Sequence, residues 1–169
     1  MRWILDACTF IYLVKAKKCS QFMQLVKYPV VIDSNVYQEV VVEGKKLKYP
    51  DASEAKKILN NFKIPVISID VSKEVSRFID PGETSCYILA KEEGICVTND
   101  DRAYKKFLCE NLKVMRLDSF FFNKFNQDYI TKFEFIKILK ELEKVNATKP
   151  KSILFFMEKI QKRCEEKND

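Results

Sequence analysis

Four acidic residues occupy separate positions in the first two-thirds of the chain: Asp6, Glu39, Glu83 and Asp100. Each lies just after a short apolar run that predicts a buried strand, or about one helical turn beyond such a run. In an open α/β sheet, the carboxyl ends of the strands meet at one edge, where binding sites collect. Carboxylate oxygens are the ligands that Mg²⁺ and Mn²⁺ prefer. The four positions therefore predict a divalent-metal site of the kind that hydrolyses phosphodiester bonds.

Each of these acids also has an ordinary structural interpretation. Asp6 suits the N-cap of a following helix, and either Asp100 or its neighbour Asp101 suits the cap of another. Glu39 falls in the middle of a predicted helix, where a glutamate commonly faces solvent. Glu83 falls in a first helical turn, where a negative charge interacts well with the helix dipole. The shared site is favoured by the four positions together and not by any one of them.

The composition excludes most other catalytic chemistries. The chain has no histidine, which rules out Ser-His-Asp and Cys-His catalysis and the usual zinc sites. Its 3 glycines cannot build a glycine-rich nucleotide-binding loop. None of its 6 cysteines has CxxC spacing, and Cys86 and Cys96 are expected to pack in the core. Acid–base chemistry must therefore come from carboxylates, lysine, tyrosine or metal-activated water.

Length and charge indicate a soluble globular protein. A chain of 169 residues suits one domain with a real core and a small appendage. The net charge of +6 is compatible with a polyanionic partner and equally with an ordinary lysine-rich surface. A charge follows the apolar start too soon for a signal peptide, and no apolar run could span a membrane. We expect a cytoplasmic protein with free thiols.

Short apolar runs alternate with longer amphipathic segments as far as Leu117. The short runs predict strands at 3–5, 30–32, 66–71, 95–97 and 114–117. The segments between them predict helices at 9–16, 34–43, 52–62, 72–79, 83–93 and 101–108. This alternation indicates a three-layer α/β/α sandwich with a central parallel sheet of about five strands.

The last third of the chain is predicted to be helical. A phenylalanine-rich stretch follows Ser119, and its rings are expected to pack in a core, with a dimer interface as the alternative. Thr131 and Glu134 form a capping box that starts a helix reaching about Val145, and the final helix is predicted at 152–163. We divide the chain into an α/β domain and a C-terminal helical extension, at residues 1–145 and 146–169.

Four segments together resemble those of a known family. Residues 4–6, 31–39, 81–90 and 97–103 are similar in order and spacing to the motifs of PIN-domain proteins, and 134–142 resembles the closing helix of one PIN subgroup. The resemblance covers about residues 1–145. It implies a parallel sheet, usually five-stranded, flanked by helices, and it implies metal-dependent cleavage of RNA with Mg²⁺ or Mn²⁺.

The resemblance also implies roles for individual residues. The catalytic acids would be Asp6, Glu39, Glu83 and Asp100. The metal ligands would be Asp6, Glu83, Asp100 and Asp101. Thr98 would orient the cluster by hydrogen bonding. A serine or asparagine commonly follows the first aspartate closely in this family, whereas this chain has Ala7 and Cys8, so Thr9 is expected to take the polar role.

Substrate and partners follow from the same resemblance. RNA is the expected substrate, and Lys15, Arg102 and Lys105 lie on segments that start near the predicted site and could contact phosphates, with a solvated basic face as the alternative. Toxin members of the family imply an antitoxin partner and a homodimer, whereas the longer tail leaves room for an RNA-processing role. Two rival functions are an inactive PIN-fold RNA-binding or scaffold protein and a flap-type DNA nuclease, the latter disfavoured by the short chain.

Overall fold

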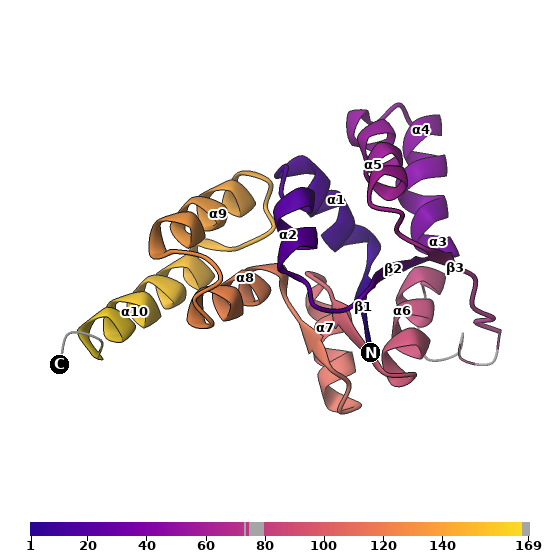
Figure 1. Ribbon diagram of the computed structural model, residues 1–169. Coiled ribbons are helices and arrows are strands. Elements are labelled where there is room, and N and C mark those ends of the chain that lie inside the picture. The colour runs from indigo at the N-terminus through magenta and orange to yellow at the C-terminus, as the bar shows by residue number, and fades with distance from the viewer. Residues whose placement is uncertain (73, 75–79, 167–169) are drawn as a thin grey trace. The chain divides into compact units, whose positions relative to one another are not determined.

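The computed structural model describes residues 1–72, 74 and 80–166 (Figure 1). The chain divides into two compact units, Met1–Arg116 and Leu117–Asp169. We call them unit 1 and unit 2. In the described residues, no helix combines the length and the apolar character that crossing a membrane requires.

Unit 1 is built on a five-stranded parallel sheet with the order β3-β2-β1-β4-β5. The strands are β1 (Arg2–Leu5), β2 (Val30–Asp33), β3 (Val66–Ile67), β4 (Gly94–Val97) and β5 (Val114–Met115). The three central strands β2, β1 and β4 are almost entirely buried, as expected for a parallel sheet that helices cover on both faces. The predicted α/β sandwich with about five parallel strands is confirmed.

The order of the strands reverses beside β1, which pairs with β2 on one side and β4 on the other. Leu5 pairs with Val97, so the residues that follow these two strands leave the same edge of the sheet next to each other. In open α/β sheets, ligands bind at such a reversal, outside the carboxyl ends of the strands. The topology therefore directs Asp6 and the 98–100 segment to one place.

Eight helical segments of unit 1 lie in the described residues. They are α1 (Ala7–Lys15), α2 (Cys19–Leu25), α3 (Ser34–Tyr37), the π-helix η1 (Gln38–Glu43), α4 (Gly44–Lys46), α5 (Pro50–Asn61), α6 (Pro81–Lys91) and α7 (Asp101–Cys109). Aspartate side chains cap the N-termini of four of them by accepting backbone N–H groups, at Asp6, Asp33, Asp80 and Asp100. Helix α6 packs on β1, β2 and β4, and α1 packs on α5 and η1.

The structure corrects several predicted boundaries. Strand β3 is limited to Val66–Ile67, and residues 68–71 are not in a strand. Strand β5 ends before Leu117, which is the first residue of helix α8. Helix α2 was not predicted. The predicted helix at 72–79 falls largely outside the described residues.

Unit 2 consists of α8 (Leu117–Asn126), α9 (Lys132–Lys144) and α10 (Pro150–Glu166). The predicted capping box is confirmed, since Thr131 accepts from Glu134 N and the Glu134 carboxylate accepts from Thr131 N. The phenylalanines form the core of this unit, with ring centroids 5.0–6.1 Å apart among Phe122, Phe125, Phe135 and Phe156. These rings therefore pack against one another, as the sequence predicted.

Candidate active site

A cavity of about 530 Å³ opens at the carboxyl edge of the unit 1 sheet. The four acids predicted from the sequence as catalytic, Asp6, Glu39, Glu83 and Asp100, all line it. They come from the end of β1, from η1, from the first turn of α6 and from the segment after β4. The fold thus brings together four carboxylates that are as much as 94 positions apart in the chain.

Asp6 is the most constrained of these acids. Its Oδ1 accepts the backbone N–H of Thr9 at 2.7 Å, which caps α1. Burial raises the pKa of the Asp6 carboxyl above its ordinary value of 3.8, and hydrogen bonds from Thr98, Thr9 and Cys8 oppose that shift. The carboxyl group is therefore held in one position in a place where its negative charge is poorly solvated.

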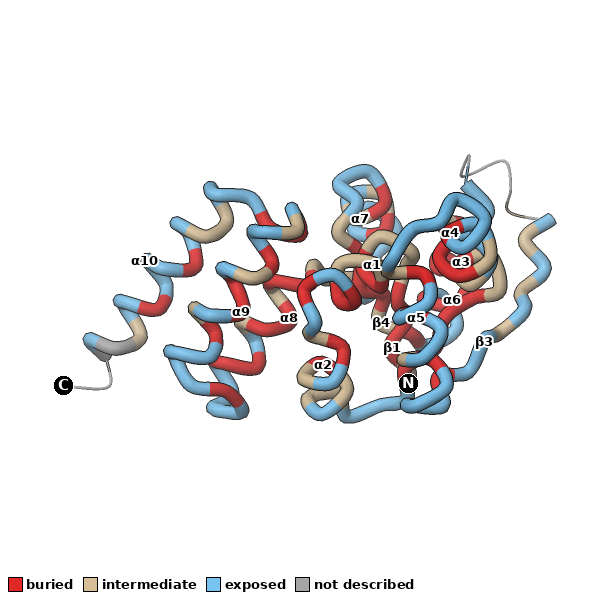
Figure 2. Tube along the Cα trace, turned by 90° about the horizontal axis from the view of Figure 1, so that it is seen from above, coloured by how far each residue is buried: buried red, intermediate tan, exposed pale blue. Residues whose placement is uncertain are grey.

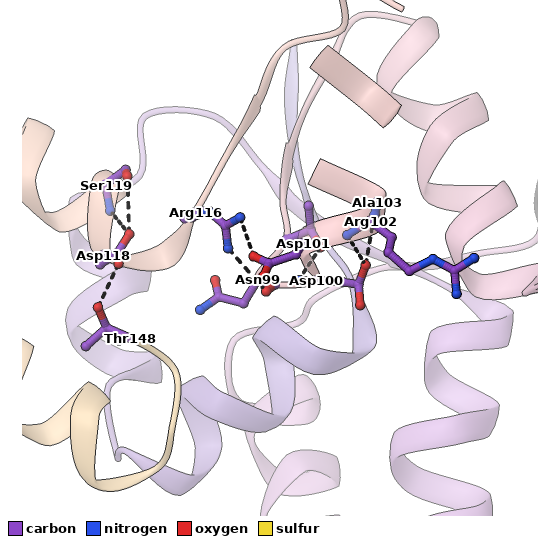
Figure 3. Close-up of polar contacts among 10 residues, drawn as sticks. Asn99, Asp100, Asp101, Arg102, Ala103, Arg116, Asp118, Ser119 and Thr148 are labelled. Atoms are coloured by element: carbon purple, nitrogen blue, oxygen red, sulfur yellow. Dashed lines mark hydrogen bonds and ion pairs between the residues drawn. The ribbon is translucent and has the colours of Figure 1, made fainter. Parts of the chain in front are cut away.

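Thr98 links the first and last acids of the cluster. Its side chain hydrogen-bonds to the Asp6 carboxyl, and its Oγ1 accepts the backbone N–H of Asp100 at 3.1 Å. The Asp100 Oδ1 in turn accepts the N–H groups of Arg102 and Ala103, both at 2.8 Å, at the start of α7 (Figure 3). One hydroxyl thus positions two carboxylates from neighbouring strands.

Glu39 lies in η1, where the chain forms a π-helix in place of the predicted α-helix. Three consecutive β-branched residues, at 40–42, follow it, and β-branched side chains are crowded in a regular α-helix. The π-turn places Glu39 in the cavity lining, and π-turns are frequent at functional sites. Partial burial raises the pKa of Glu39 above 4.5, and the charges of Asp80 and Asp6 add to the shift.

Glu83 faces the cavity from the first turn of α6. Burial raises the pKa of its carboxyl above 4.5; the charge of Lys106 opposes that shift, and the charges of Asp100 and Asp80 add to it. Asp80 is a fifth acid in the cavity lining that the sequence analysis did not identify. Its Oδ1 caps α6 by accepting Glu83 N at 3.0 Å.

Gly82 keeps the space between two of these acids open. A Cβ at this position would lie 3.1 Å from Asp80 Oδ1 and 4.0 Å from Glu39 Oε2. The missing side chain lets carboxylates from η1 and from the start of α6 approach the same volume. Gly82 falls in the 81–90 segment that resembles a PIN motif, and Asp80 directly precedes that segment.

The structure separates the other predicted site residues. Asp101 does not line the cavity, and its carboxylate binds the Arg116 guanidinium at 2.5 Å (Figure 3). Lys15 is likewise outside the lining, with its Nζ 3.9 Å from Asp51 Oδ2. Of the predicted basic residues on α7, Arg102 lines the cavity and the exposed Lys105 does not. Lys106, one position further along, does line it.

Three thiols also contribute to the lining: Cys8, Cys86 and Cys96. Cys8 Sγ donates to the Asp6 carboxylate, at 3.1 Å to Oδ2 and 3.3 Å to Oδ1. Burial and the charge of Asp6 raise the pKa of Cys8 well above its ordinary value, so the thiol keeps its proton and can donate it. Cys8 therefore orients Asp6 together with Thr9, which is fully buried.

The acids of the cavity suit a hard divalent cation. None of the five acids that line it makes an ion pair within the described part of the chain, although the charges of Lys106 and Arg102 act on Glu83. Within that part, no group of three or more His, Cys, Asp or Glu side chains is placed to hold a metal ion. Mg²⁺ nevertheless takes only one or two protein carboxylates and fills its other positions with water and substrate phosphate. The donor chemistry therefore fits Mg²⁺ or Mn²⁺.

Residues 2–151 match the model of a family described as a PIN domain (DUF3368). The match covers most of the chain, and the chain therefore belongs to the PIN-domain family. Members of this family are generally nucleases that use divalent metals and act on RNA.

Other comparisons are less informative. A search of the curated proteins gave no match. Among solved structures, the chain is similar to a domain of a functionally unknown protein from Methanocaldococcus jannaschii DSM 2661, with a TM-score of 0.46 and 16% sequence identity. That likeness covers 69% of this chain and 90% of the other.

Proposed function

We propose that this protein is a Mg²⁺- or Mn²⁺-dependent endoribonuclease whose reaction takes place in the unit 1 cavity. The observation that carries the proposal is the convergence of Asp6, Glu39, Glu83 and Asp100 on one cavity of a PIN domain. Like charges that share a poorly solvated site repel, and a divalent cation relieves that repulsion. The raised pKa values of Asp6, Glu39 and Glu83 support this role, because burial is the largest cause of each shift and a cation in the cavity would stabilise the charged carboxylates.

The role that we propose for each acid follows from the contacts that position its side chain. Asp6 and Asp100 are fixed by helix caps and by Thr98, so they form the rigid side of the cation site. Glu39 and Glu83 reach in from η1 and α6, and Cys8 and Thr9 keep Asp6 oriented. A divalent cation supplies charge neutralisation and acidifies water for attack on phosphorus. Since Arg116 engages Asp101, we leave Asp101 out of the proposed ligand set.

Two basic side chains of α7 are placed to receive the substrate phosphate. Arg102 and Lys106 lie one helical turn apart and both line the cavity beside Asp100. They would hold the phosphodiester against the acidic cluster and offset its charge. Any contact of Lys15 or Lys105 with RNA would lie outside the cavity, because neither residue lines it.

The decisive experiment is cleavage of a mixed RNA pool with Mg²⁺, Mn²⁺ or EDTA. Asp6→Asn and Asp100→Asn keep a good N-cap residue and remove a charge, so both should fold and lose about a thousandfold in rate. Asp101→Asn is the matched control, since it changes a neighbouring acid outside the cavity, and it should stay near wild type. Cleavage in EDTA, or full activity of both cavity variants, would overturn the proposal. RNA binding without cleavage under any of these conditions would favour the inactive RNA-binding protein.

The same chemistry serves a toxin or an RNA-processing enzyme in the cytoplasm. A toxin would arrest growth when expressed, Asp6→Asn would abolish the arrest, and a co-expressed antitoxin protein would relieve it. A homodimer in solution would agree with the toxin role. Growth without arrest, together with cleavage in vitro, would indicate RNA processing.

A further inference from the structure

The helical run that carries Glu39 ends in an exposed basic tip that the cleavage chemistry does not use. Segments α3, η1 and α4 follow one another without a break from residue 34 to residue 46, and α5 returns beside them (Figure 1). The end of α4 and its connection to α5 are residues 45–49, Lys-Lys-Leu-Lys-Tyr, which we call the hairpin tip. Every residue of the tip is exposed (Figure 2).

The charge of the hairpin tip is not neutralised by the protein. Within the described residues, Lys45, Lys46 and Lys48 take part in no ion pair. Asp51, the acid that follows the tip, is engaged by Lys15 from α1 at 3.9 Å. Three positive charges in four residues therefore face solvent together, and such a group favours a polyanion through counterion release.

Two large apolar side chains of the tip are also exposed, one between the lysines and one directly after them. Leu47 is 62% exposed and Tyr49 is 57% exposed. An exposed aromatic ring among lysines suits single-stranded nucleic acid, because bases stack on the ring while the lysines contact phosphates. An acidic protein would use the charges but would gain less from the isolated tyrosine.

The tip is held in a defined conformation. Tyr49 N donates to Gly44 O at 2.8 Å and Lys48 N donates to Lys45 O at 3.0 Å, which is the Schellman pattern of a helix end. Lys48 takes the left-handed conformation, with φ of 57°, where glycine is usual. Gly44 lets α4 approach α5 closely, since a Cβ there would lie 2.9 Å from Ala52 Cβ. The tip is therefore ordered before any ligand binds, which lowers the entropy lost on binding.

We propose that the hairpin tip is a second contact for single-stranded RNA, which holds the strand as it leaves the cavity. The inference rests on the proposed function for its substrate. Glu39 and Lys46 lie on the same helical run seven residues apart, which corresponds to about 10 Å at the helical rise. A strand with its scissile phosphate beside Glu39 would reach the tip after a few nucleotides, so the tip favours long substrates over very short ones.

The test is RNA binding without metal, so that it does not depend on catalysis. Fluorescence anisotropy in EDTA would compare wild type with Lys45→Gln/Lys46→Gln/Lys48→Gln, using a labelled single strand of about 12 nucleotides. We expect the Kd to rise about tenfold and the slope of log Kd against log salt to fall by about 2. Tyr49→Ala should weaken binding about fivefold, with little change in the salt slope.

The matched control is Lys137→Gln/Lys140→Gln/Lys144→Gln, which removes the same charge from exposed positions on α9. An equal loss of affinity in both triple variants, or no loss in the tip variant, would overturn the proposal. Cleavage separates this failure from failure of the proposed function. If the tip proposal is right and the protein is a nuclease, the tip variant cleaves a dinucleotide as well as wild type does. If only the nuclease proposal is wrong, neither protein cleaves, while the difference in binding remains.

Discussion

The two units treat their buried and half-buried charged groups in opposite ways. In unit 2, Asp118 and Arg163 have hydrogen-bond partners from the same unit. In unit 1, the acids at the carboxyl edge of the sheet face a cavity together and make no ion pair within the described residues. We therefore infer that the charged groups of unit 2 stabilise the fold, whereas the cavity acids of unit 1 bind a ligand.

Asp118 and Arg163 show the first case. Asp118 is 3% exposed and accepts from Ser119 N at 2.6 Å, Ser119 Oγ at 3.2 Å and Thr148 Oγ1 at 2.8 Å (Figure 3). Arg163 donates to Asn126 O at 3.0 Å and Asp128 Oδ1 at 2.9 Å, at the end of α8. These bonds connect α8 to the α9–α10 connection and to α10, so the polar groups stabilise unit 2.

Asp6, Glu39 and Glu83 show the second case. The pKa of each is raised, with burial as the largest cause. The hydrogen bonds to Asp6 fix its position but do not cancel its charge. An unfolded chain would solvate these carboxylates better, so they cost stability in the metal-free protein. This cost agrees with the proposal that the cavity binds a divalent cation, which would stabilise the charged carboxylates.

The largest effect that tests this contrast is expected in unit 2. Asp118→Ala leaves two hydroxyls and one backbone N–H without an acceptor, which should lower the free energy of unfolding by about 2–3 kcal/mol. Thermal unfolding measures the loss, and cleavage well below the melting temperature should be unchanged. An unaltered melting temperature would show that the Asp118 bonds do not hold the unit together.

The second test concerns the basic side chains on α7. Arg102→Gln and Lys106→Gln should each raise KM for RNA about tenfold, or about 1.4 kcal/mol, because each removes a phosphate contact in the cavity. Lys105→Gln is the control on the same helix, and it should have little effect because Lys105 does not line the cavity. An equal rise in KM in all three variants would mean that α7 contributes only its overall positive charge.

The smallest effect is on the pH dependence of stability without metal. Because the folded protein holds the protons of Asp6, Glu39 and Glu83 more tightly than the unfolded chain, stability should rise as the pH falls from 8 toward the raised pKa values. The gain levels off below their ordinary values of 3.8 and 4.5. Asp6→Asn should reduce the change in the free energy of unfolding over this pH range by about 1 kcal/mol.

Melting curves in EDTA over this pH range would measure the effect as the difference between wild type and Asp6→Asn. Carboxylates remote from Asp6 titrate equally in both proteins and cancel in that difference, whereas Glu39, whose pKa the Asp6 charge raises, adds to it. Identical pH profiles would show that the Asp6 charge costs the fold nothing. Saturating Mn²⁺ should flatten the wild-type profile and leave that of the variant nearly unchanged.

The sheet was predictable because its strands are short apolar runs with distinct breaks. The runs ending at Leu5, Ile32 and Val97 were located to within one residue of the observed strands. The last run was extended too far, since Leu117 is apolar in either a strand or a buried helix. Helix α2 was missed because its seven residues give too short a pattern to distinguish from a loop.

The sequence by itself determined the family, through the order of four PIN-like segments, and it predicted which four acids meet at one cavity. Tertiary structure decided which polar groups share the cavity. Asp80 and Lys106 line it, whereas Asp101 and Lys105 lie outside it, although Asp101 directly follows the lining residue Asp100 and Lys105 directly precedes Lys106. The reason is geometric. A strand pattern specifies which residues reach the edge of a sheet, but a helix turns its side chains by about 100° per residue, so packing alone selects the face that meets the site.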